Sequence, residues 1–437
     1  MRLFRAFNRS SAYEWRFLAK NPWDLTMILW LPLATVLLVW WIFSQTQITN
    51  LPIGVMDQDQ SPLSNTVARY LEASPDITIQ HFYYSQATAK AAILQRDIYA
   101  VVIIPENFER NILSSKPAPL ILQVNAQYGT HSGIIQKSVQ SVAGTLSAGV
   151  EIKRLIKQGM APSQAAVAYS PISIQRISLF NVATNYQQFL ASTVIPALLH
   201  ILAMVIGATT IGRELRDKRL GRWYHFIARG YPDLTLESDN ISDNNATNTT
   251  EKTSYQSVST PKSMPKSMPK KVQLTVLFAG LIGKYVWSML AYSIWAALAL
   301  WLATWQQTVA IESLIITYCG LLLLMALSFW LGAIFTLGSF SLRTGLSATG
   351  FISAPSYAFA GVTFPYIAMS DNAQHWSDAL PLTHYLKLHI AQLQMQAPAA
   401  ISMPIVYGLS LATIVAMSLT ALLTRRALSH PERWGAR

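Results

Sequence analysis

Long apolar runs alternate along this chain with polar and mixed segments. The first run, residues 25–43, has about 19 residues, enough for a helix to cross the roughly 30 Å hydrocarbon layer of a membrane. Similar runs lie at 189–211, 274–303, 313–338, 346–368 and 403–424. The pattern predicts a polytopic α-helical membrane protein with about six transmembrane helices. The run at 346–368 contains Pro355, Gly361 and Pro365, so we expect it to be kinked or re-entrant.

Residues 1–24, which precede the first run, are basic and amphipathic. Arginine and lysine residues alternate here with Phe, Trp and Leu, a pattern typical of a helix that lies in the membrane interface. The first run is longer than the apolar region of a signal peptide, and Trp40, Trp41 and a polar segment follow it in place of a small-residue cleavage site. We therefore expect an uncleaved anchor.

Residues 44–188 contain no span and have the pattern of a small α/β domain. Segments rich in Ile and Val, bounded by Pro, Asp or Asn, predict strands at 51–57, 76–82, 98–105 and 118–124. Helices are predicted at 61–74, 85–95, 104–113 and about 131–158. This alternation favours a mixed sheet covered by helices.

The distribution of charge sets the expected direction of the membrane helices. The 437 residues include 33 Lys+Arg and 21 Asp+Glu, a net charge of +12, and charged residues make up 12% of the chain against roughly 25% in soluble domains. The cations gather at helix ends, above all in 212–223 and in the tail 425–437, which the positive-inside rule places in the cytoplasm. Both termini are then cytoplasmic and 44–188 is extracytoplasmic. Nucleic-acid binding is not expected, because the cations do not collect on one soluble face.

Three further segments complete the predicted organisation. Residues 212–230 form a charged cytoplasmic segment, and residues 231–272, dominated by Ser, Thr, Asn, Asp, Lys and Pro, are predicted to be a disordered cytoplasmic insert. Residues 273–424 hold the third to sixth transmembrane helices. Within the third, Lys284 is expected to extend toward the cytoplasmic interface.

The sequence contains none of the common catalytic or metal-binding motifs. It lacks the GxxxxGK[ST], HExxH and GxSxG patterns, and its single cysteine, Cys319, permits neither an internal disulfide nor a cysteine-based metal site. Asp57 and Asp59 are interpreted as a turn with N-capping, in preference to a calcium site. Three histidines lack the spacing of a metal site and are expected to be surface or interfacial: His375, His384 and His389.

Two polar features of the membrane region each leave two interpretations open. His200 lies inside the second span, where a lone polar residue either serves function or makes a hydrogen bond between helices. The segment 212–223 places mixed charges at a membrane exit, where they either dock a cytoplasmic partner or only cap the span. Its charged residues are Arg213, Glu214, Arg216, Asp217, Lys218, Arg219 and Arg222.

The order of six short motifs resembles the permease subunits of ABC-2 type transporters, in particular the subgroup with a large extracytoplasmic domain between the first two spans. The motifs are YEWRFLAKNPWDL with a following LP, IGVMDQDQSPLS, AVVIIPENFERNI, IGRELRDKRLGRW, GKYVWSML, and FAGVTFPYIAMS with LPLTHYLKLHI. They are similar, in this order, to the family's elbow helix, the opening of the external domain, its IP-x-x-F element, the coupling segment, the start of the third span and the signature near the fifth span. Leu220–Arg222 departs from the usual Gly-Thr pair, and Met369–Ser370 departs from the usual Met-Pro.

The resemblance implies an exporter permease that moves a small or amphiphilic substrate, as in multidrug efflux, out of the cytoplasm or inner leaflet. A separate ABC ATPase subunit would power it, so this chain is not an enzyme and holds no cofactor, since the partner chain binds ATP and Mg²⁺. A second permease copy or a paralogue, membrane lipid and a periplasmic adaptor protein are the other implied partners, in a bacterial inner membrane.

The resemblance also implies roles for single residues. Those implied to couple to the ATPase are Arg213, Glu214, Arg216, Asp217, Arg219 and Gly221. Those assigned to the translocation path or to structural polar roles are His200, Pro355, Gly361 and Pro365.

A membrane-anchored sensor or scaffold, whose external domain binds an envelope partner without transport, is the alternative function. The two are distinguished by an adjacent gene for an ABC ATPase, which only the transporter predicts.

Overall fold

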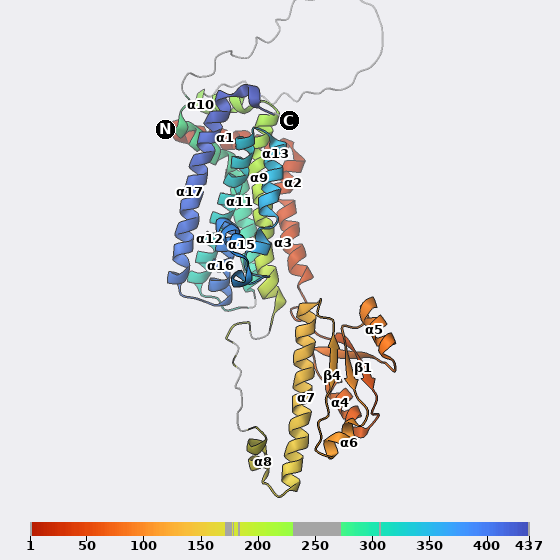
Figure 1. The fold of residues 1–437 in the computed structure, drawn as a ribbon. Coiled ribbons are helices and arrows are strands. Elements are labelled where there is room, and N and C mark those ends of the chain that lie inside the picture. Colours follow the sequence, from red (N-terminus) through yellow and green to blue (C-terminus); the bar gives the residue numbers. More distant parts are fainter. Residues whose placement is uncertain are drawn as a thin grey trace, which may run out of the picture. The chain divides into compact units, whose positions relative to one another are not determined.

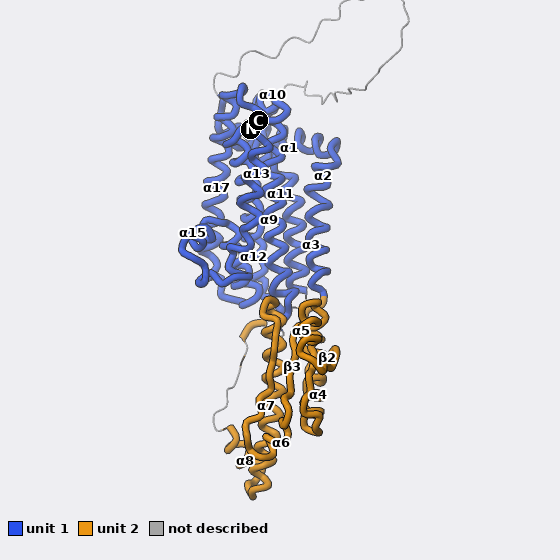
Figure 2. The backbone as a smooth tube through the Cα atoms, turned by 45° about the vertical axis from the view of Figure 1, so that its right-hand side comes forward, with its two compact units in different colours: residues 1–44, 184–437 blue, residues 45–183 orange. Residues whose placement is uncertain are grey.

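The computed structural model describes residues 2–170, 177, 179–181, 184–229, 272–305 and 307–435, and the fold is drawn in Figure 1. The chain divides into two compact units (Figure 2): unit 1 comprises Met1–Ser44 and Thr184–Arg437, and unit 2 comprises Gln45–Ala183. The predicted insert at 231–272 lies outside the described residues except for Val272.

Unit 1 is a bundle of long apolar helices. Five helical segments of the described residues are long and apolar enough to cross a membrane: Pro22–Ile42, Gln187–Arg216, Leu274–Thr304, Ile311–Ser339 and Ala399–Ser429. They correspond to α2 (Pro22–Ile28) with α3 (Trp30–Ile42), the π-helix Gln187–Ala191 with α9 (Ser192–Arg216), α11 (Leu274–Thr304), α12 (Ile311–Ser339) and α17 (Ala399–Ser429). The predicted class, a polytopic helical membrane protein with an inserted domain, is confirmed.

The apolar run at 346–368 is interrupted, as its prolines predicted. α13 (Leu342–Ser353) ends just before Pro355, and the single turn α14 (Ser356–Phe359) follows. Gly361 then adopts a φ of +77°, a backbone conformation that favours glycine. Where six spans were expected, the described residues thus contain five long helical segments and one broken segment. After it come the turn Tyr366–Ala368, α15 (Asp371–Ala379), α16 (Pro381–His389) and the π-helix Ile390–Gln394, and the turn Pro431–Arg433 follows α17.

The centre of unit 1 is the crossing of α9 and α12, where two glycines allow backbone contact. A Cβ added at Gly207 would lie 2.1 Å from the carbonyl oxygen of Phe329, and one added at Gly332 would lie 2.0 Å from that of Met204. Small residues at such crossings are typical of membrane helices, which gain stability from close packing.

Both described ends of the chain lie at the same end of unit 1 (Figure 1). α1 (Arg2–Lys20) packs one face against α11, with Ala6, Ser10, Tyr13, Glu14 and Leu18 buried. Near the C-terminus, the amide of Gly435 donates to the carbonyl oxygen of Phe340, at the end of α12, at 3.1 Å. The predicted amphipathic helix at 1–24 is therefore a packed part of the bundle.

Unit 2 is built on a four-stranded mixed sheet with the strand order β2-β1-β3-β4. β1 (Leu51–Asp57) pairs in parallel with β2 (Ile77–Phe82) and with β3 (Ala100–Ile104), and β4 (Ile121–Val124) is antiparallel to β3. The helices are α4 (Pro62–Glu72), α5 (Gln86–Gln95), α6 (Phe108–Leu113), α7 (Gly129–Lys157) and α8 (Pro162–Tyr169). The four strands and first four helices lie close to their predicted ranges.

Alternation along the strands of unit 2 places helices on both faces of the sheet. Ile53 and Val55 point into a core shared with α4 and α7, whereas Met56 and Val101 point into a smaller core with α5. The sheet is therefore the middle of three layers.

Two aspartates fix the turns at the end of β1. Asp57 Oδ1 accepts hydrogen bonds from the amides of Asp59 and Gln60, at 3.0 and 2.9 Å. Asp59 accepts from the amides of Phe108 and Glu109, at 2.9 and 3.0 Å, and so caps the N-terminus of α6. The interpretation as a turn with N-capping agrees with these bonds. The bonds of Asp59 also join two motifs that are distant in the sequence, since Phe108 and Glu109 lie 49 and 50 residues after Asp59.

Candidate functional site: a buried ion network

Four charged side chains from three helices of unit 1 meet inside the bundle. Arg213 and Glu214 lie in the last turn of α9, Glu14 lies in α1 and Lys284 lies in α11. Their exposed fractions are 5%, 2%, 1% and 0% respectively. Because a charge away from water is costly unless it is paired, the pairing of these groups determines whether the arrangement is stable.

Each buried cation in this network contacts a buried carboxylate. Lys284 Nζ lies 2.7 Å from Glu214 Oε1 and 3.2 Å from Glu14 Oε2. Arg213 is paired with Glu14 through its Nη2, and its Nη1 lies 3.4 Å from Asp24 at the start of the first span. The network thus joins α1, the α2 segment, α9 and α11.

Aromatic side chains surround the ions. The Arg213 guanidinium lies 3.8 Å from the centre of the Phe17 ring, and Lys284 Nζ lies 5.0 Å from that of Tyr13 and 5.4 Å from that of Trp223. The Tyr13 hydroxyl donates to Glu214 at 3.4 Å. These rings exclude water while their faces attract the cations, which strengthens each ion pair.

The ionisation of Glu14 follows from this environment. Burial alone would raise the pKa of its carboxyl, but the charges and hydrogen bonds of Arg213 and Lys284 outweigh burial and hold that pKa below its usual range. Burial and the neighbouring Glu214 raise the pKa of the Tyr13 hydroxyl, so it stays a hydrogen-bond donor. Glu14 is therefore a carboxylate at neutral pH.

Further contacts hold α1 against this site. The indole nitrogen of Trp223 in α10 (Leu220–Arg229) donates to Ser10 Oγ at 3.1 Å, and that of Trp287 donates to the carbonyl oxygen of Ser11 at 2.9 Å. A Cβ added at Gly283 of α11 would lie 2.4 Å from the carbonyl oxygen of Phe7, so the two helices touch through their backbones. The end of α9, the start of α10 and α1 are thus packed as one body.

The charged segment 212–223 is divided between two helices. α9 continues through Arg216, a turn follows, and α10 begins at Leu220. Arg216, Asp217, Lys218 and Arg222 are exposed, Arg219 is half-buried, and Gly221 lies in the first turn of α10. Arg213 and Glu214, by contrast, point inward, so the expectation that they are displayed at the membrane exit is wrong: their ion pairs hold them inside.

Lys284 also differs from its expected position. It does not extend to the interface, because Glu14 and Glu214 hold its amine inside the bundle. Sequence reasoning singled out Lys284 but overlooked Glu14. A signal was present: Glu14 is the single acidic residue before Asp24, and Lys284 is the single charge in its apolar run. Two isolated opposite charges in apolar surroundings are candidates for pairing.

The other predicted polar residues do not join this network. His200 Nδ1 lies 2.6 Å from Ser328 Oγ on α12. Since that hydroxyl donates to the carbonyl oxygen of Leu324 at 2.5 Å, the imidazole nitrogen is the donor, and the bond links α9 to α12. Pro355 stands at the break between α13 and α14, beside a 2.9 Å hydrogen bond between Thr193 and Tyr357.

Gly361 and Pro365 lie in the same broken segment as Pro355. Gly361 follows α14, and Pro365 precedes the turn Tyr366–Ala368. The three histidines considered as metal ligands have separate partners: His375 and His384 contact the carbonyl oxygens of Asp371 and Asp378, and His389 contacts the Tyr385 hydroxyl. The expectation of a surface or interfacial position is wrong for His389, which is buried because α16 packs this face against the bundle.

Comparison with known families gives one match. Residues 22–224, from the start of α2 through unit 2 and α9 into α10, match the sequence model of the family described as ABC-2 family transporter protein. Curated protein sequences give no match. The family match, together with the apolar helices, supports an ABC-2 type permease, a multi-pass membrane component of a transporter.

Proposed function

We propose that this chain, an ABC-2 type permease by its family match, is the transmembrane subunit of an exporter driven by a separate ABC ATPase. Its substrate would be a small or amphiphilic molecule taken from the cytoplasm or inner leaflet, as in multidrug efflux. The ATPase would bind ATP and Mg²⁺. A second permease copy or paralogue would complete the pore, with lipid around it and a periplasmic adaptor as a further partner.

The sidedness of the proposal is supported by the charges of unit 1. The end that holds both termini carries exposed cations at Arg2, Arg5, Arg16, Lys20, Arg216, Lys218, Arg222, Arg343, Arg425, Arg426 and Arg433. In the described segments 307–310 and 360–398, which lie toward the other end, Lys387 is the single Lys or Arg. Under the positive-inside rule the basic end faces the cytoplasm of an inner-membrane protein. The chain leaves unit 1 for unit 2 after α3, so unit 2 would be extracytoplasmic.

The observation that carries the mechanism is the burial of Arg213 and Glu214 directly before a stretch whose charged residues Arg216, Asp217, Lys218 and Arg222 are exposed. An ATPase that binds the exposed part would press on a body whose interior is held together by ion pairs. Since buried ion pairs resist separation, the displacement would pass to α9 and α11 rather than be lost in a flexible loop. In this proposal Arg216, Asp217, Arg219 and Gly221 belong to the contact surface, and Arg213 and Glu214 transmit the movement.

The test is co-purification of the full chain with a candidate ABC ATPase from a neighbouring gene, followed by transport in vesicles. Arg216→Glu with Arg222→Glu reverses two exposed charges of the segment and should release the ATPase. Arg343→Glu with Arg425→Glu makes the same change of charge at exposed positions of the same end and should retain it. Absence of any ATPase association in the unsubstituted chain would contradict the proposal and favour the anchored scaffold.

A further inference from the structure

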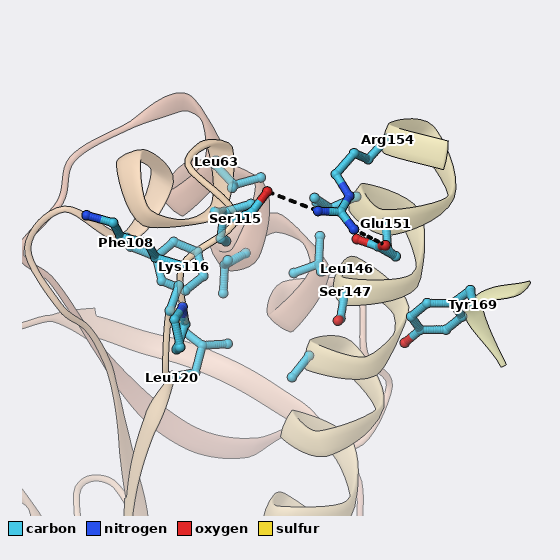
Figure 3. A pocket seen from close by; sticks show the side chains of 16 residues that line it. Leu63, Phe108, Ser115, Lys116, Leu120, Leu146, Ser147, Glu151, Arg154 and Tyr169 are labelled. Carbon is cyan, nitrogen blue, oxygen red and sulfur yellow. Dashed lines mark hydrogen bonds and ion pairs between the residues drawn. The ribbon is translucent and has the colours of Figure 1, made fainter. Parts of the chain in front are cut away.

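Unit 2 contains a cavity of about 740 Å³ beside the C-terminal half of α7 (Figure 3). Its residues come from α4, α6, α7, α8 and the loop between α6 and β4. This volume lies within the range of roughly 300–1,000 Å³ typical of small-molecule sites.

The cavity exists because α7 is longer than the sheet it covers. With 29 residues, α7 extends for about 43 Å, at 1.5 Å per residue, whereas the strands have four to seven residues. Ile135, Val139 and Val142 are buried against the sheet, and the same face continues as Leu146 and Val150. Beyond the strands this face is covered by the loop and α8 only in part, which leaves the space.

The interior of the cavity is apolar. Leu63, Val67, Phe108, Ile112, Leu120 and Leu146 line it. On α7, Ala143 and Ser147 contribute little volume, so the helix does not fill the space with its own side chains. An apolar chain would gain free energy by replacing water here.

The rim of the cavity carries a net positive charge. Arg154 Nη2 pairs with Glu151 at 2.6 Å, and its Nη1 donates to Ser115 Oγ at 3.0 Å, so these two α7 residues balance each other (Figure 3). Lys116 also lines the cavity, is exposed, and makes no side-chain ion pair within the described residues. The charge of Lys116 is therefore available to bind an anionic ligand, and the neighbouring Ser115 hydroxyl can donate a hydrogen bond to that ligand.

We propose that this cavity binds an anionic single-chain amphiphile, with its apolar chain along α7 and its acidic headgroup at Lys116 and Ser115. The interior selects for an apolar chain, and the uncompensated cation selects for a carboxylate or phosphate headgroup. The proposal rests on unit 2 alone and does not depend on transport.

The test is photolabelling of the full chain in phosphatidylcholine nanodiscs. The probes are palmitate with a photoreactive group in its chain, a lysophosphatidate with the same chain, and the matching uncharged alcohol. Both anionic probes should label peptides from 108–120 and 143–154, and the alcohol should label them clearly less. The ratio between the two anionic probes then assigns a fatty acid or a phospholipid as the source.

Two matched pairs of variants make the result specific. Ser147→Phe places a ring inside the cavity, in the path of a chain that lies along α7, and should lower labelling at least about fivefold. Ser141→Phe adds the same ring at an exposed position of α7 that does not line the cavity, and should leave labelling unchanged. Lys116→Glu should lower labelling by the anionic probes but not by the alcohol, whereas Lys90→Glu on α5 should change neither.

Three results would overturn the proposal. These are the absence of label on both peptides, an equal effect of the two Phe variants, and equal labelling by the alcohol and the anions. None of them bears on whether an ATPase associates with unit 1.

Discussion

Units 1 and 2 both use carboxylates to join segments that are distant in the sequence, but they neutralise these carboxylates in different ways. In unit 1, Glu14 and Glu214 are buried and bind the cations of Arg213 and Lys284. In unit 2, Asp59 lies at a turn and binds the backbone amides at the start of α6. A buried carboxylate needs a full opposite charge, whereas one near water is sufficiently stabilised by amide donors and the helix dipole. Acidic residues therefore tolerate substitution very differently in the two units.

The largest effect is expected for Lys284→Met. Glu14 and Glu214 would lose their shared cation inside the bundle, and removing one partner of a buried pair costs about 3–5 kcal/mol. Hydrogen exchange of α1 and α9 peptides, measured by mass spectrometry on the full chain, should become much faster. Lys387→Met is the control, since its pair with Asp378 at 3.7 Å is exposed and should contribute little.

A double variant sharpens this result. Lys284→Met with Glu214→Leu removes one cation and one anion together, and Glu14 retains its ion pair with Arg213. We expect the double variant to recover most of the protection lost in Lys284→Met, because the remaining charges are paired. An additive loss in the double variant would show that packing, not charge balance, determines the effect.

A smaller effect, confined to unit 2, is expected for Asp59→Ala. The variant removes the cap of α6, which costs about 1–2 kcal/mol. Peptides covering Asn107–Leu113 should exchange faster, and peptides of unit 1 should not change. Asp97→Ala, at an exposed position of the same unit, is the matched control. Equal effects of the two variants would contradict the capping role.

The local features of both units could be predicted from the sequence. The strands and helices of unit 2 follow from runs of Ile and Val and from Ser and Pro at helix starts, since these signals depend on neighbouring residues. The break near Pro355 follows from proline's missing amide in the same way. The predictions failed where the partner is remote: 270 residues separate Lys284 from Glu14, so each appeared as a lone charge. The cavity beside α7 was not predicted because it results from the difference in length between α7 and the strands that α7 covers.

A further effect depends on pH. The hydrogen bond of Ser61 and the amides at the start of α6 outweigh burial and lower the pKa of Asp59 from 3.8. Its contribution to stability is therefore complete above the unfolded pKa and is lost as the pH falls through the lower folded value. The ratio of pepsin cleavage rates near α6, Asp59→Asn over wild type, should exceed one at about pH 4.5 and fall toward one as the pH is lowered from there. A ratio that does not depend on pH would exclude the charge as the cause.

The smallest effect on stability is expected at Arg216, three residues beyond Arg213 in the same helix. Among the described residues Arg216 pairs only with its neighbour Asp217, and 63% of its side chain is exposed, so Arg216→Ala should cost less than about 0.5 kcal/mol. Arg213→Ala would leave Glu14 with Lys284 alone and should loosen α1 strongly.

For association with the ATPase, the proposed coupling role predicts that the exposed Arg216 matters despite its small effect on stability, because Arg216 belongs to the surface that the ATPase would contact. Arg216→Ala should therefore weaken association while hydrogen exchange in α1 stays unchanged. If association instead follows the stability of the network across both variants, the exposed part of the segment is not the contact surface.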